Sequence, residues 1–462
     1  MYVPILLFVI STICSAPTSY VVNVHAEIVL TDSNLEIEVL ADLPRTFGSA
    51  SAMSFLGQDD ILVLEQQGKV YRILNGDISD NPVAELDVDS EGERGLLGIA
   101  IGNAPENNRT QVQDTPRYVF LYYTEKVGPQ NGNCEEECEI NEILVNRLYR
   151  YEFVDNKLTN ARMLMEIPVE SVSEDGISHR QHFGGAITLG PDNNIYLATG
   201  DGGVCRKSCQ KAVDTGFLNA QTANKREGGQ AVGRGGILYL TQDGESVYPV
   251  LGSDYPLNLY YAYGIRNSFG LDFDPVTGFL WDTENGPAFG DEINLVEPGF
   301  NSGWAKIQGE WIIHNYTLLE PNALNKGYFY SSASSHDNNL EDFGGKGQYS
   351  APEFVWNSTI GVTSLKFFSS DKLGEQYEND MFVGAYYPGL LYHFNLDESR
   401  RNLFLEEPLT DKVANSEKEL DKIVFGSGFN SIVDIEAGPD GYLYLLTLNG
   451  EILKIVPKEI KE

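Results

Sequence analysis

The chain has 462 residues, which suits either several ordinary domains or one large all-β domain. Glycine (46 residues), tyrosine (25) and phenylalanine (22) are abundant, and this composition favours strands and tight turns over helices. The formal net charge of −35 argues against nucleic acid or an anionic membrane surface as a partner, because phosphates would be repelled. It is compatible with a solvated surface, with cation binding or with a salty medium.

The N-terminal 26 residues carry no charge and contain a short apolar run from Ile5 to Ile13. Val24-His25-Ala26 offers a small-residue cleavage site, so residues 1–26 are predicted to be a secretory signal peptide. A retained N-terminal anchor is the alternative, because the basic start of a signal peptide is missing. No later stretch is apolar for 18 residues, so no other membrane span is expected. We therefore predict an exported protein that is secreted, periplasmic or held at the cell surface.

Four of the five cysteines form two closely spaced pairs, Cys134 with Cys138 and Cys205 with Cys209. In an exported protein they are expected to form two disulfides, either within the pairs or between them. A metal site built from all four thiolates is the alternative, although structural zinc usually prefers cysteines separated by two residues.

Short strand-like segments run along the whole chain and no long helical stripe interrupts them. Each is rich in β-branched or aromatic residues and is bounded by turn residues. In chain order the predicted strands and hairpins are 35–43, 61–73, 95–101, 118–123, 147–153, 182–199, 236–241, 268–281, 291–296, 362–368, 381–394, 432–437, 438–447 and 451–456.

One strand-turn-strand unit recurs at long spacing. GPDNNIYLATGDG at 190–202 and GPDGYLYLLTLNG at 438–450 are near copies, and FDPVTGFLWDTENG at 273–286 is a looser one. Repeated antiparallel strands without crossover helices predict a closed ring of blades. Counting the groups predicts one domain over 35–457, a six-bladed β-propeller of four-stranded antiparallel blades. Strand 35–43 is expected to close the ring against the C-terminal blade, with insertions near 126–142, 203–235 and 305–350.

His182 begins the stretch HFGGAITLGPDNNIYLATGDGG and is the first candidate functional residue. A histidine at the mouth of a hairpin is suited to proton transfer, and the alternative is a structural histidine that caps a turn. Arg266 and Asn267 precede the next hairpin and present donors suited to carbonyl or carboxylate oxygens. Their alternative role is a salt bridge between blades.

The loop ENGPAFGDE (284–292) is a candidate cation site. Loop carbonyls of Gly286 and Pro287, together with the acidic side chains of Asp291 and Glu292, are the oxygen ligands that calcium prefers. A surface acidic turn is the alternative.

The chain resembles the soluble quinoprotein glucose dehydrogenases, the related aldose sugar dehydrogenases and the glucose/sorbosone dehydrogenase domain. The resemblance covers most of residues 35–457. It is carried by ERGLLGIAI (93–101), HFGGAITLGPDNNIYLATGDGG (182–203), YGIRNSFGLDFDP (263–275), ENGPAFGDEINLVEPGFNSGW (284–304) and GPDGYLYLLT (438–447). That family is a six-bladed propeller that binds pyrroloquinoline quinone (PQQ) and calcium in its central cleft.

The resemblance implies a PQQ- and calcium-dependent dehydrogenase that oxidises an aldose sugar at the C1 hydroxyl. His182 would be the base, Arg266 would stabilise the oxygen that gains charge, and Asn267 and Gln181 would lie at the cofactor. The carbonyls of Gly286 and Pro287, with Asp291 and Glu292 beside them, would hold the calcium. Electrons would pass to a quinone or a small redox protein, since no nicotinamide-binding fingerprint is present.

The chain departs from the family pattern at three cationic positions. Tyr386 and Tyr387 stand where a lysine binds PQQ in the family, and Ser431 and Val433 stand where two arginines are found. Lys346 or Arg206 could supply charge instead. The alternatives are an inactive propeller that acts as an extracellular binding module and, as a third class, a calcium-dependent hydrolase.

Overall fold

A computed structural model describes residues 27–44, 47–103, 117–127, 143–169, 178–179, 181–205, 222–224, 232–313, 329–331 and 340–459. Segment 1–26, Arg206 and the cysteines at 134, 138 and 209 lie outside these residues, and of Cys205 only the backbone is described. The signal peptide and the disulfides therefore stay predictions. No helix in the described part is long and apolar enough to cross a membrane.

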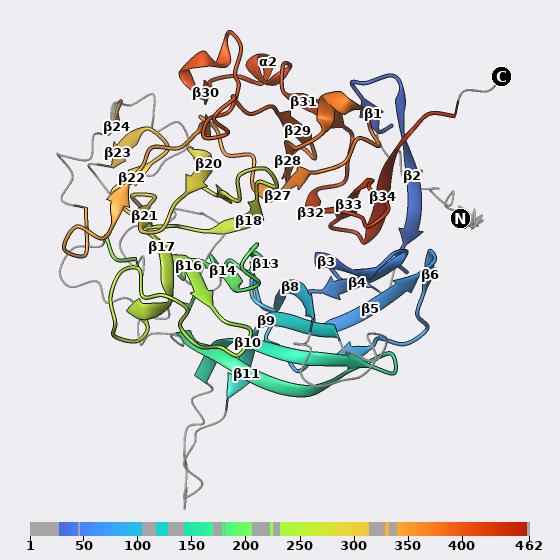
Figure 1. The fold of residues 1–462 in the computed structure, drawn as a ribbon, viewed down its shortest axis with the longest axis horizontal. Coiled ribbons are helices and arrows are strands. Elements are labelled where there is room, and N and C mark those ends of the chain that lie inside the picture. The colour runs from blue at the N-terminus through green and yellow to red at the C-terminus, as the bar shows by residue number, and fades with distance from the viewer. Residues whose placement is uncertain are drawn as a thin grey trace, which may run out of the picture.

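The described residues form sheets that follow one another along the chain around a common centre (Figure 1). The first sheet contains β3 (Ala50–Gly57), β4 (Asp60–Glu65), β5 (Lys69–Leu74), β6 (Asp77–Ile78) and β7 (Ala84–Glu85). The second contains β8 (Leu96–Asn103), β9 (Arg117–Val127), β10 (Ile143–Val154) and β11 (Lys157–Val169). The third contains β13 (Ile187–Leu189), β14 (Ile195–Thr199), β16 (Gly236–Leu240), β17 (Tyr260–Tyr263), β21 (Phe300–Asn301) and β25 (Gln348–Tyr349).

Three more large sheets complete the circuit. The fourth contains β18 (Ser268–Phe273), β19 (Leu280–Glu284), β20 (Asp291–Val296), β26 (Phe354–Trp356) and β30 (Val413–Ala414). The fifth contains β27 (Val362–Phe368), β28 (Asp380–Ala385), β29 (Leu391–Phe394), β31 (Val424–Ser427) and β1 (Val29–Leu30). The last contains β32 (Ile432–Ala437), β33 (Leu443–Thr447), β34 (Glu451–Pro457) and β2 (Leu35–Asp42).

The remaining elements are short. Two small sheets join β12 (Ser178–His179) to β15 (Val204–Cys205), and β22 (Ile307–Gln308) to β23 (Trp311–Ile313) and β24 (Phe329–Ser331). The described residues contain one short α-helix, α2 (Glu417–Leu420), and 3₁₀ turns at Leu257–Leu259, Glu375–Tyr377 and Leu409–Asp411.

The innermost strands of the large sheets contact one another in the order β3, β8, β13, β18, β27, β32, and β32 contacts β3 again. This ring confirms the predicted all-β propeller and gives it at least five blades. The blades are not all four-stranded and antiparallel as predicted. β21 and β25 extend the third sheet, and β30 extends the fourth, through parallel pairing. These short strands come from later parts of the chain that return to the outer edges of those sheets.

The N-terminal strand closes the ring, as predicted. β2 pairs antiparallel with β34 from Leu35 opposite Pro457 to Asp42 opposite Glu451. β1 pairs with β31 in the preceding sheet, so the N-terminal segment links two neighbouring sheets. Pairing the two chain ends removes a free edge that would otherwise be open to other strands.

The recurring GPD turn has a simple physical basis. Asp192 accepts a hydrogen bond from the hydroxyl of Tyr196 at 3.2 Å, four residues later. Asp440 does the same with Tyr444 at 2.8 Å. The glycine that opens each turn is needed because a Cβ there would lie 2.6 Å and 2.4 Å from the respective tyrosine ring. The repeated letters therefore record a repeated tertiary contact.

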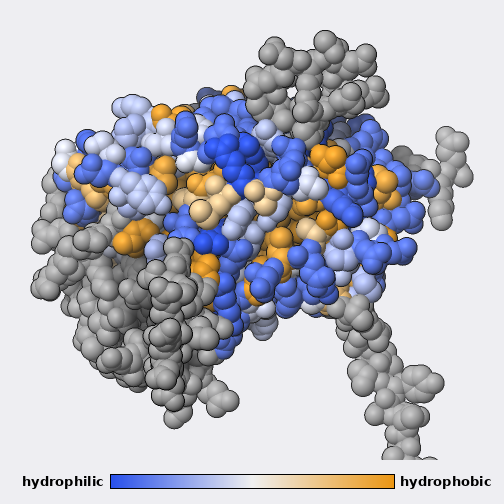
Figure 2. All heavy atoms as spheres, turned by 90° about the horizontal axis from the view of Figure 1, so that it is seen from below, coloured by the Kyte–Doolittle hydropathy of each residue, from blue (hydrophilic) through white to orange (hydrophobic). Residues whose placement is uncertain are grey.

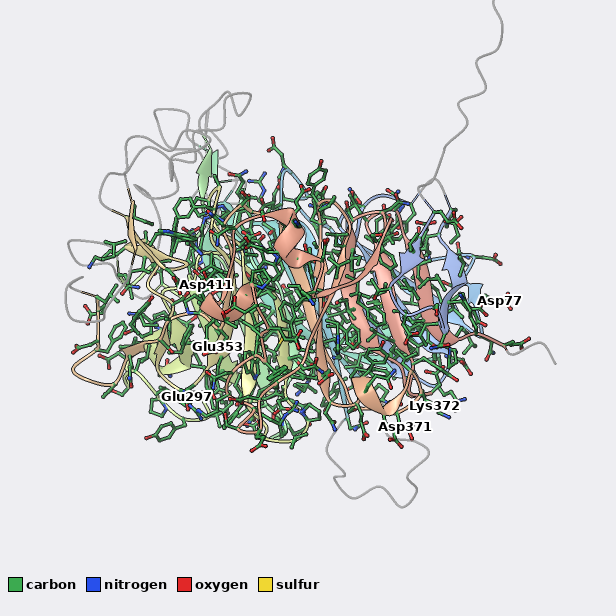
Figure 3. All side chains as sticks on the ribbon, turned by 90° about the horizontal axis from the view of Figure 1, so that it is seen from above. Asp77, Glu297, Glu353, Asp371, Lys372 and Asp411 are labelled. Atoms are coloured by element: carbon green, nitrogen blue, oxygen red, sulfur yellow. The ribbon has the colours of Figure 1, made fainter. Side chains whose placement is uncertain are left out.

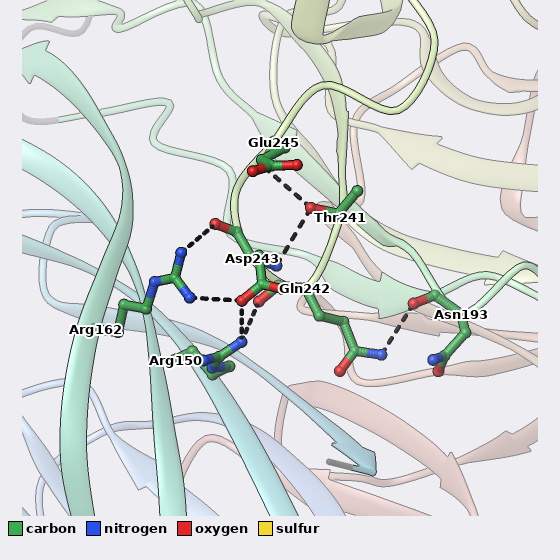
Figure 4. A network of polar contacts seen from close by, with 7 residues as sticks. All are labelled: Arg150, Arg162, Asn193, Thr241, Gln242, Asp243 and Glu245. Atoms are coloured by element: carbon green, nitrogen blue, oxygen red, sulfur yellow. Dashed lines mark hydrogen bonds and ion pairs between the residues drawn. The ribbon is translucent and has the colours of Figure 1, made fainter. Parts of the chain in front are cut away.

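Charged side chains tie neighbouring sheets together at the surface. Arg150 and Arg162, from β10 and β11, both donate to Asp243 in the loop after β16, at 2.7 and 2.6 Å (Figure 4). Charged residues such as Asp77 and Lys372 lie at the periphery (Figure 3), and one face of the molecule shows mainly hydrophilic residues with apolar ones scattered among them (Figure 2). The acidic composition thus includes a solvated surface.

A different kind of ion pair lies inside the molecule. Arg400 donates two hydrogen bonds to the carboxylate of Asp274, at 2.7 and 2.8 Å. Asp274 is fully buried at the turn between β18 and β19, and Arg400 comes from the loop after β29. This pair fastens the fourth sheet to the fifth.

Candidate active site

His182 lies in the loop before β13 and adopts a left-handed backbone conformation, with φ of 59°. Such a conformation is uncommon for a non-glycine residue and persists only where its surroundings hold it. One restraint is Glu93, whose carboxylate accepts a hydrogen bond from the His182 backbone N–H at 2.7 Å. The histidine is buried, with 4% of its surface exposed.

The imidazole of His182 is oriented by Asp201, which directly follows Gly200 after β14. Its Nδ1 lies 2.6 Å from the Asp201 carboxylate. A carboxylate only accepts, so Nδ1 carries the hydrogen and Nε2 keeps its lone pair. Among the described residues, Asp201 is the only one that hydrogen-bonds this ring. This is the geometry of an oriented general base.

Asp201 is itself held from two sides. Its second oxygen accepts a hydrogen bond from the indole of Trp304 at 2.6 Å, and its backbone N–H donates to the carbonyl of Arg266 at 2.9 Å. Both Asp201 and Trp304 are completely buried. The aspartate therefore joins the base to the segment that carries the arginine.

Glycines in the GDGG turn make room for this arrangement. A Cβ at Gly203 would lie 2.2 Å from His182 Nδ1, and one at Gly202 would lie 2.4 Å from the guanidinium of Arg234. Arg234 is buried at this turn and is a second cation close to the site. The two glycines are thus required by close approach of side chains.

Replacing Gly203 by alanine is therefore expected to push the imidazole away from Asp201. Turnover should fall by more than about tenfold, while overpacking should lower the stability of the fold by only about 1–3 kcal/mol. Dye-linked turnover and urea unfolding of the same preparation check this. Gly57 is the matched control, because a Cβ there meets nothing within 4 Å. Full turnover in Gly203→Ala would contradict the assigned position of the ring.

Arg266 and Asn267 lie beside the histidine, in the turn between β17 and β18. The Arg266 guanidinium donates to the carbonyl of Asn285 at 2.8 Å and lies 5.3 Å from the centre of the Trp304 ring. Asn267 accepts a hydrogen bond from the Gly184 N–H at 3.0 Å and reaches Glu93 at 3.5 Å. The structure thus brings together two of the three sequence motifs.

The third motif, the loop at Gly286 and Pro287, adjoins Asn285. No described residue donates a hydrogen bond to the carbonyl oxygens of Gly286 and Pro287. The Gly286 N–H donates to Asp291 at 2.8 Å, and the other oxygen of Asp291 accepts backbone N–H groups from Ile360 and Gly361, each at 2.8 Å. Asp291 therefore shapes the loop, and the loop presents two carbonyl oxygens that fit a hard cation.

The side chain of Glu292 is directed into the protein behind this loop. Its carboxylate accepts hydrogen bonds from Gln308 at 2.8 Å, from the Gly309 N–H and from Asn294 at 3.2 Å. It lies opposite Glu284 in the β19–β20 pairing, and Ser302 bridges the two carboxylates. Burial raises the pKa of Glu292 to about 8, and burial and the neighbouring Glu292 raise that of Glu284.

These contacts within the protein determine where the side chains of Asp291 and Glu292, two predicted metal ligands, are directed. No group of three histidine, cysteine, aspartate or glutamate side chains that could hold a metal ion occurs among the described residues. The carboxylates of Asp291 and Glu292 are engaged by the chain's own donors, so the Gly286 and Pro287 carbonyls are the loop oxygens without a donor among the described residues. Glu284 also accepts the Arg266 backbone N–H at 2.8 Å and so supports the neighbouring turn.

Of the other predicted residues that the structure describes, none hydrogen-bonds the imidazole of His182. Gln181 precedes His182 and is exposed, as is Lys346. Tyr386 and Tyr387 are exposed at the tip between β28 and β29. The innermost strands enclose a cavity of about 70 Å³ lined by Val433 and the neighbouring Asp434, where Lys366 is paired with Glu436 at 2.8 Å.

Sequence reasoning missed four residues of the site: Glu93, Asp201, Arg234 and Trp304. Three of them lie inside motifs that were recognised, since Glu93 begins ERGLLGIAI, Asp201 follows a predicted strand in GDGG and Trp304 ends the run GFNSGW. The available signal for Asp201 and Trp304 was an aspartate close to the candidate histidine, together with a tryptophan whose indole can donate a hydrogen bond. The contacts of Glu93 and Arg234 are made across different sheets, so nothing in the local sequence indicated what these two side chains bind.

Comparison with known proteins places this geometry in a family. The pattern of the Glucose / Sorbosone dehydrogenase family matches residues 47–454. An uncharacterized protein of Synechocystis is 25% identical over 418 residues, which cover 87% of this chain and 82% of the relative. The aldose sugar dehydrogenase YliI of Escherichia coli is 27% identical over 61% of this chain and 62% of its own. Quinoprotein glucose dehydrogenase B of Acinetobacter calcoaceticus is 30% identical over 49% of this chain and 43% of its own.

Solved structures agree on the fold. The apo form of the soluble aldose sugar dehydrogenase from Escherichia coli superposes with a TM-score of 0.61 at 22% identity, over 92% of this chain and all of that one. The PQQ-bound aldose sugar dehydrogenase from Streptomyces coelicolor gives 0.54 at 18% identity, over 92% and 99%. Because the family pattern spans nearly the whole of the described fold, this chain belongs to the Glucose / Sorbosone dehydrogenase family.

Proposed function

We propose that the protein is an exported dehydrogenase that oxidises an aldose sugar at its C1 hydroxyl, with PQQ and calcium as cofactors. The observation that carries the proposal is the His182–Asp201 pair, which the Asp201 N–H joins to Arg266, and Arg266 in turn donates to Asn285 next to Gly286 and Pro287. Family membership supports an oxidoreductase, and relatives named as an aldose sugar dehydrogenase and a quinoprotein support the substrate class and the quinone.

The donors at the site fit these groups. Arg266 and Asn267 would hold the quinone through charge-assisted and amide hydrogen bonds, and the carbonyls of Gly286 and Pro287 would hold the calcium. When bound, the quinone would supply the hydride acceptor. The site's own cation, Arg266, is fixed by Asn285 and Trp304, so it needs no reorganisation to face developing negative charge.

His182 performs the proton transfer in this proposal. Its Nε2 takes the proton of the C1 hydroxyl, and Asp201 stabilises the imidazolium that forms. Burial of Asp201 and Trp304 keeps water from competing for the carboxylate. The left-handed backbone at His182, held by Glu93, aims the ring in advance.

Three wider features belong to the same proposal. We propose six blades, because six innermost strands contact in a closed order. Export follows from the uncharged N-terminal segment. The electron acceptor would be a quinone or a small redox protein.

Reconstitution tests the proposed function. Purified protein with calcium, titrated with PQQ at micromolar concentration, should show the spectrum of a bound quinone and then reduce a dye when an aldose is added. A chelator should abolish the activity and added calcium should restore it, because the two carbonyls alone cannot bind the quinone. Absence of any spectral change would refute PQQ as the cofactor.

A second candidate function is favoured by one observation. Tyr386 and Tyr387 carry no charge where a cation would be expected, and Ser431 and Val433 likewise provide none. A propeller that binds a saccharide without oxidising it would explain these residues. Saccharide binding in the absence of any quinone spectrum would favour this function over the first.

A further inference from the structure

Tyr386 and Tyr387 form a rigidly held but exposed aromatic pair at the tip between β28 and β29. Their side chains are 47% and 74% exposed. Their backbones are fixed, because the Tyr386 N–H donates to the Gly361 carbonyl at 2.8 Å and the Tyr387 N–H donates to the Ile360 carbonyl at 3.0 Å. The two side chains therefore reach into solvent from a backbone that hydrogen bonds hold in place.

The pair lies at the edge of the candidate active site. A Cβ at Gly361 would lie 3.2 Å from the Cβ of Tyr386 and 3.9 Å from the side-chain oxygen of Asn285. Gly361 thus fits between the tyrosine and Asn285, whose carbonyl binds Arg266. Asp291 accepts hydrogen bonds from the N–H groups of both Ile360 and Gly361. These bonds connect the backbone that holds the two tyrosines to the Gly286–Pro287 loop.

The chemistry of the two rings favours a neutral sugar as their ligand. An aromatic face carries partial negative charge, and the C–H face of a pyranose ring is apolar with partial positive charge, so the two stack. The phenol hydroxyls can also bond sugar hydroxyls. PQQ, with three carboxylates, finds no cation here and could only accept hydrogen bonds from the two phenols. Exposed aromatic side chains beside a polar site are a common mark of ligand binding.

We propose that Tyr386 and Tyr387 form a subsite that stacks on a second sugar ring, so that the preferred substrate is the reducing end of an oligosaccharide. The inference rests on the proposed function in one respect: the first ring places its C1 hydroxyl at His182. The ring linked to it then extends outward past Asn285 and Gly361 to the tyrosine pair. A monosaccharide would leave the pair unoccupied.

The test is saccharide binding to the full-length protein without PQQ or calcium, measured by titration calorimetry with glucose, maltose and cellobiose. At least one disaccharide should bind about tenfold more tightly than glucose, a difference of about 1.4 kcal/mol. Tyr386→Ala and Tyr387→Ala should each remove most of that advantage and leave glucose binding unchanged. The corresponding phenylalanine variants should keep it, because the ring is retained. Tyr248→Ala is the matched control, since Tyr248 is also 68% exposed but lies between β16 and β17.

Three results would overturn the subsite. These are equal binding of glucose and both disaccharides, alanine variants that bind like the wild type, and alanine variants that alter only the PQQ titration. Failure of the proposed function is recorded separately, by absence of dye reduction in the reconstituted protein. A disaccharide preference that depends on the tyrosines without any dye reduction would keep the subsite and reject the dehydrogenase.

Discussion

Replacing His182 by asparagine should lower turnover of the reconstituted protein by about 10²–10⁴-fold, the usual contribution of a positioned general base. Asparagine is chosen because it tolerates the left-handed backbone found at this position, with φ of 59°, and cannot take a proton. The bound-quinone spectrum should persist, since Arg266 and the loop carbonyls are unchanged. Dye reduction with saturating sugar measures the effect.

A second histidine provides a matched control. His393 on β29 is paired with Asp380 at 2.8 Å, and it packs against Phe382 and Phe425 in the fifth sheet. His393→Asn removes the same chemical group from the same kind of pair and should leave turnover at the wild-type level. Equal losses in both variants would show that His182 acts through stability and is not the base.

The Asp201→Asn variant separates orientation of the base from its presence. An amide in place of the carboxylate can donate to Nδ1, which favours the opposite tautomer with hydrogen on Nε2. Turnover should fall sharply while sugar binding changes little. The indole of Trp304 would lose its charged acceptor at the same time, so the variant also tests how far the site depends on that buried network.

Local periodicity predicted most inner and middle strands of the sheets, because one apolar face and a turn signal suffice to define them, but it missed the innermost strand β3. Strand β11 was missed, since residues from Lys157 to Met163 are mostly exposed and show no apolar alternation. The short parallel pairs at β21, β25 and β30 were missed for another reason. Their partners are far away in sequence, and nothing local specifies such pairing.

The same distinction applies to the site. His182, Arg266 and the Gly286–Pro287 loop were recognised because each lies in a distinctive motif. Glu93 acts on His182 across 89 residues, and its role exists only once two blades have met. The acidic residues at 291 and 292 were expected as ligands, and that role stays a prediction; their carboxylates accept hydrogen bonds from backbone and side-chain donors of the chain itself.

The largest expected effect on stability concerns the buried pair of Asp274 and Arg400. Arg400→Met should lower the free energy of unfolding by about 3–5 kcal/mol, because it leaves the Asp274 carboxylate buried without its partner. Asp274→Asn combined with Arg400→Met should recover much of that loss, since the stranded charge is then gone. Urea unfolding of the single and double variants measures both numbers.

The pH dependence of this loss distinguishes charge from packing. Burial alone would raise the pKa of Asp274, but hydrogen bonds from Arg400, Thr277 and the Val276 N–H, together with the charge of Arg400, outweigh it and hold that pKa below its ordinary value. In the wild type the pair therefore stabilises the fold above the ordinary carboxyl pKa, and this stabilisation is lost as pH falls through the lowered value. The difference between wild type and Arg400→Met should shrink in the same direction, because protonation also relieves the stranded carboxylate. The exposed pair of Arg162 and Asp243, both half exposed, is the control, and Arg162→Met should cost at most about 1 kcal/mol. A pH-independent loss in Arg400→Met would mean that its side chain stabilises the fold by packing alone.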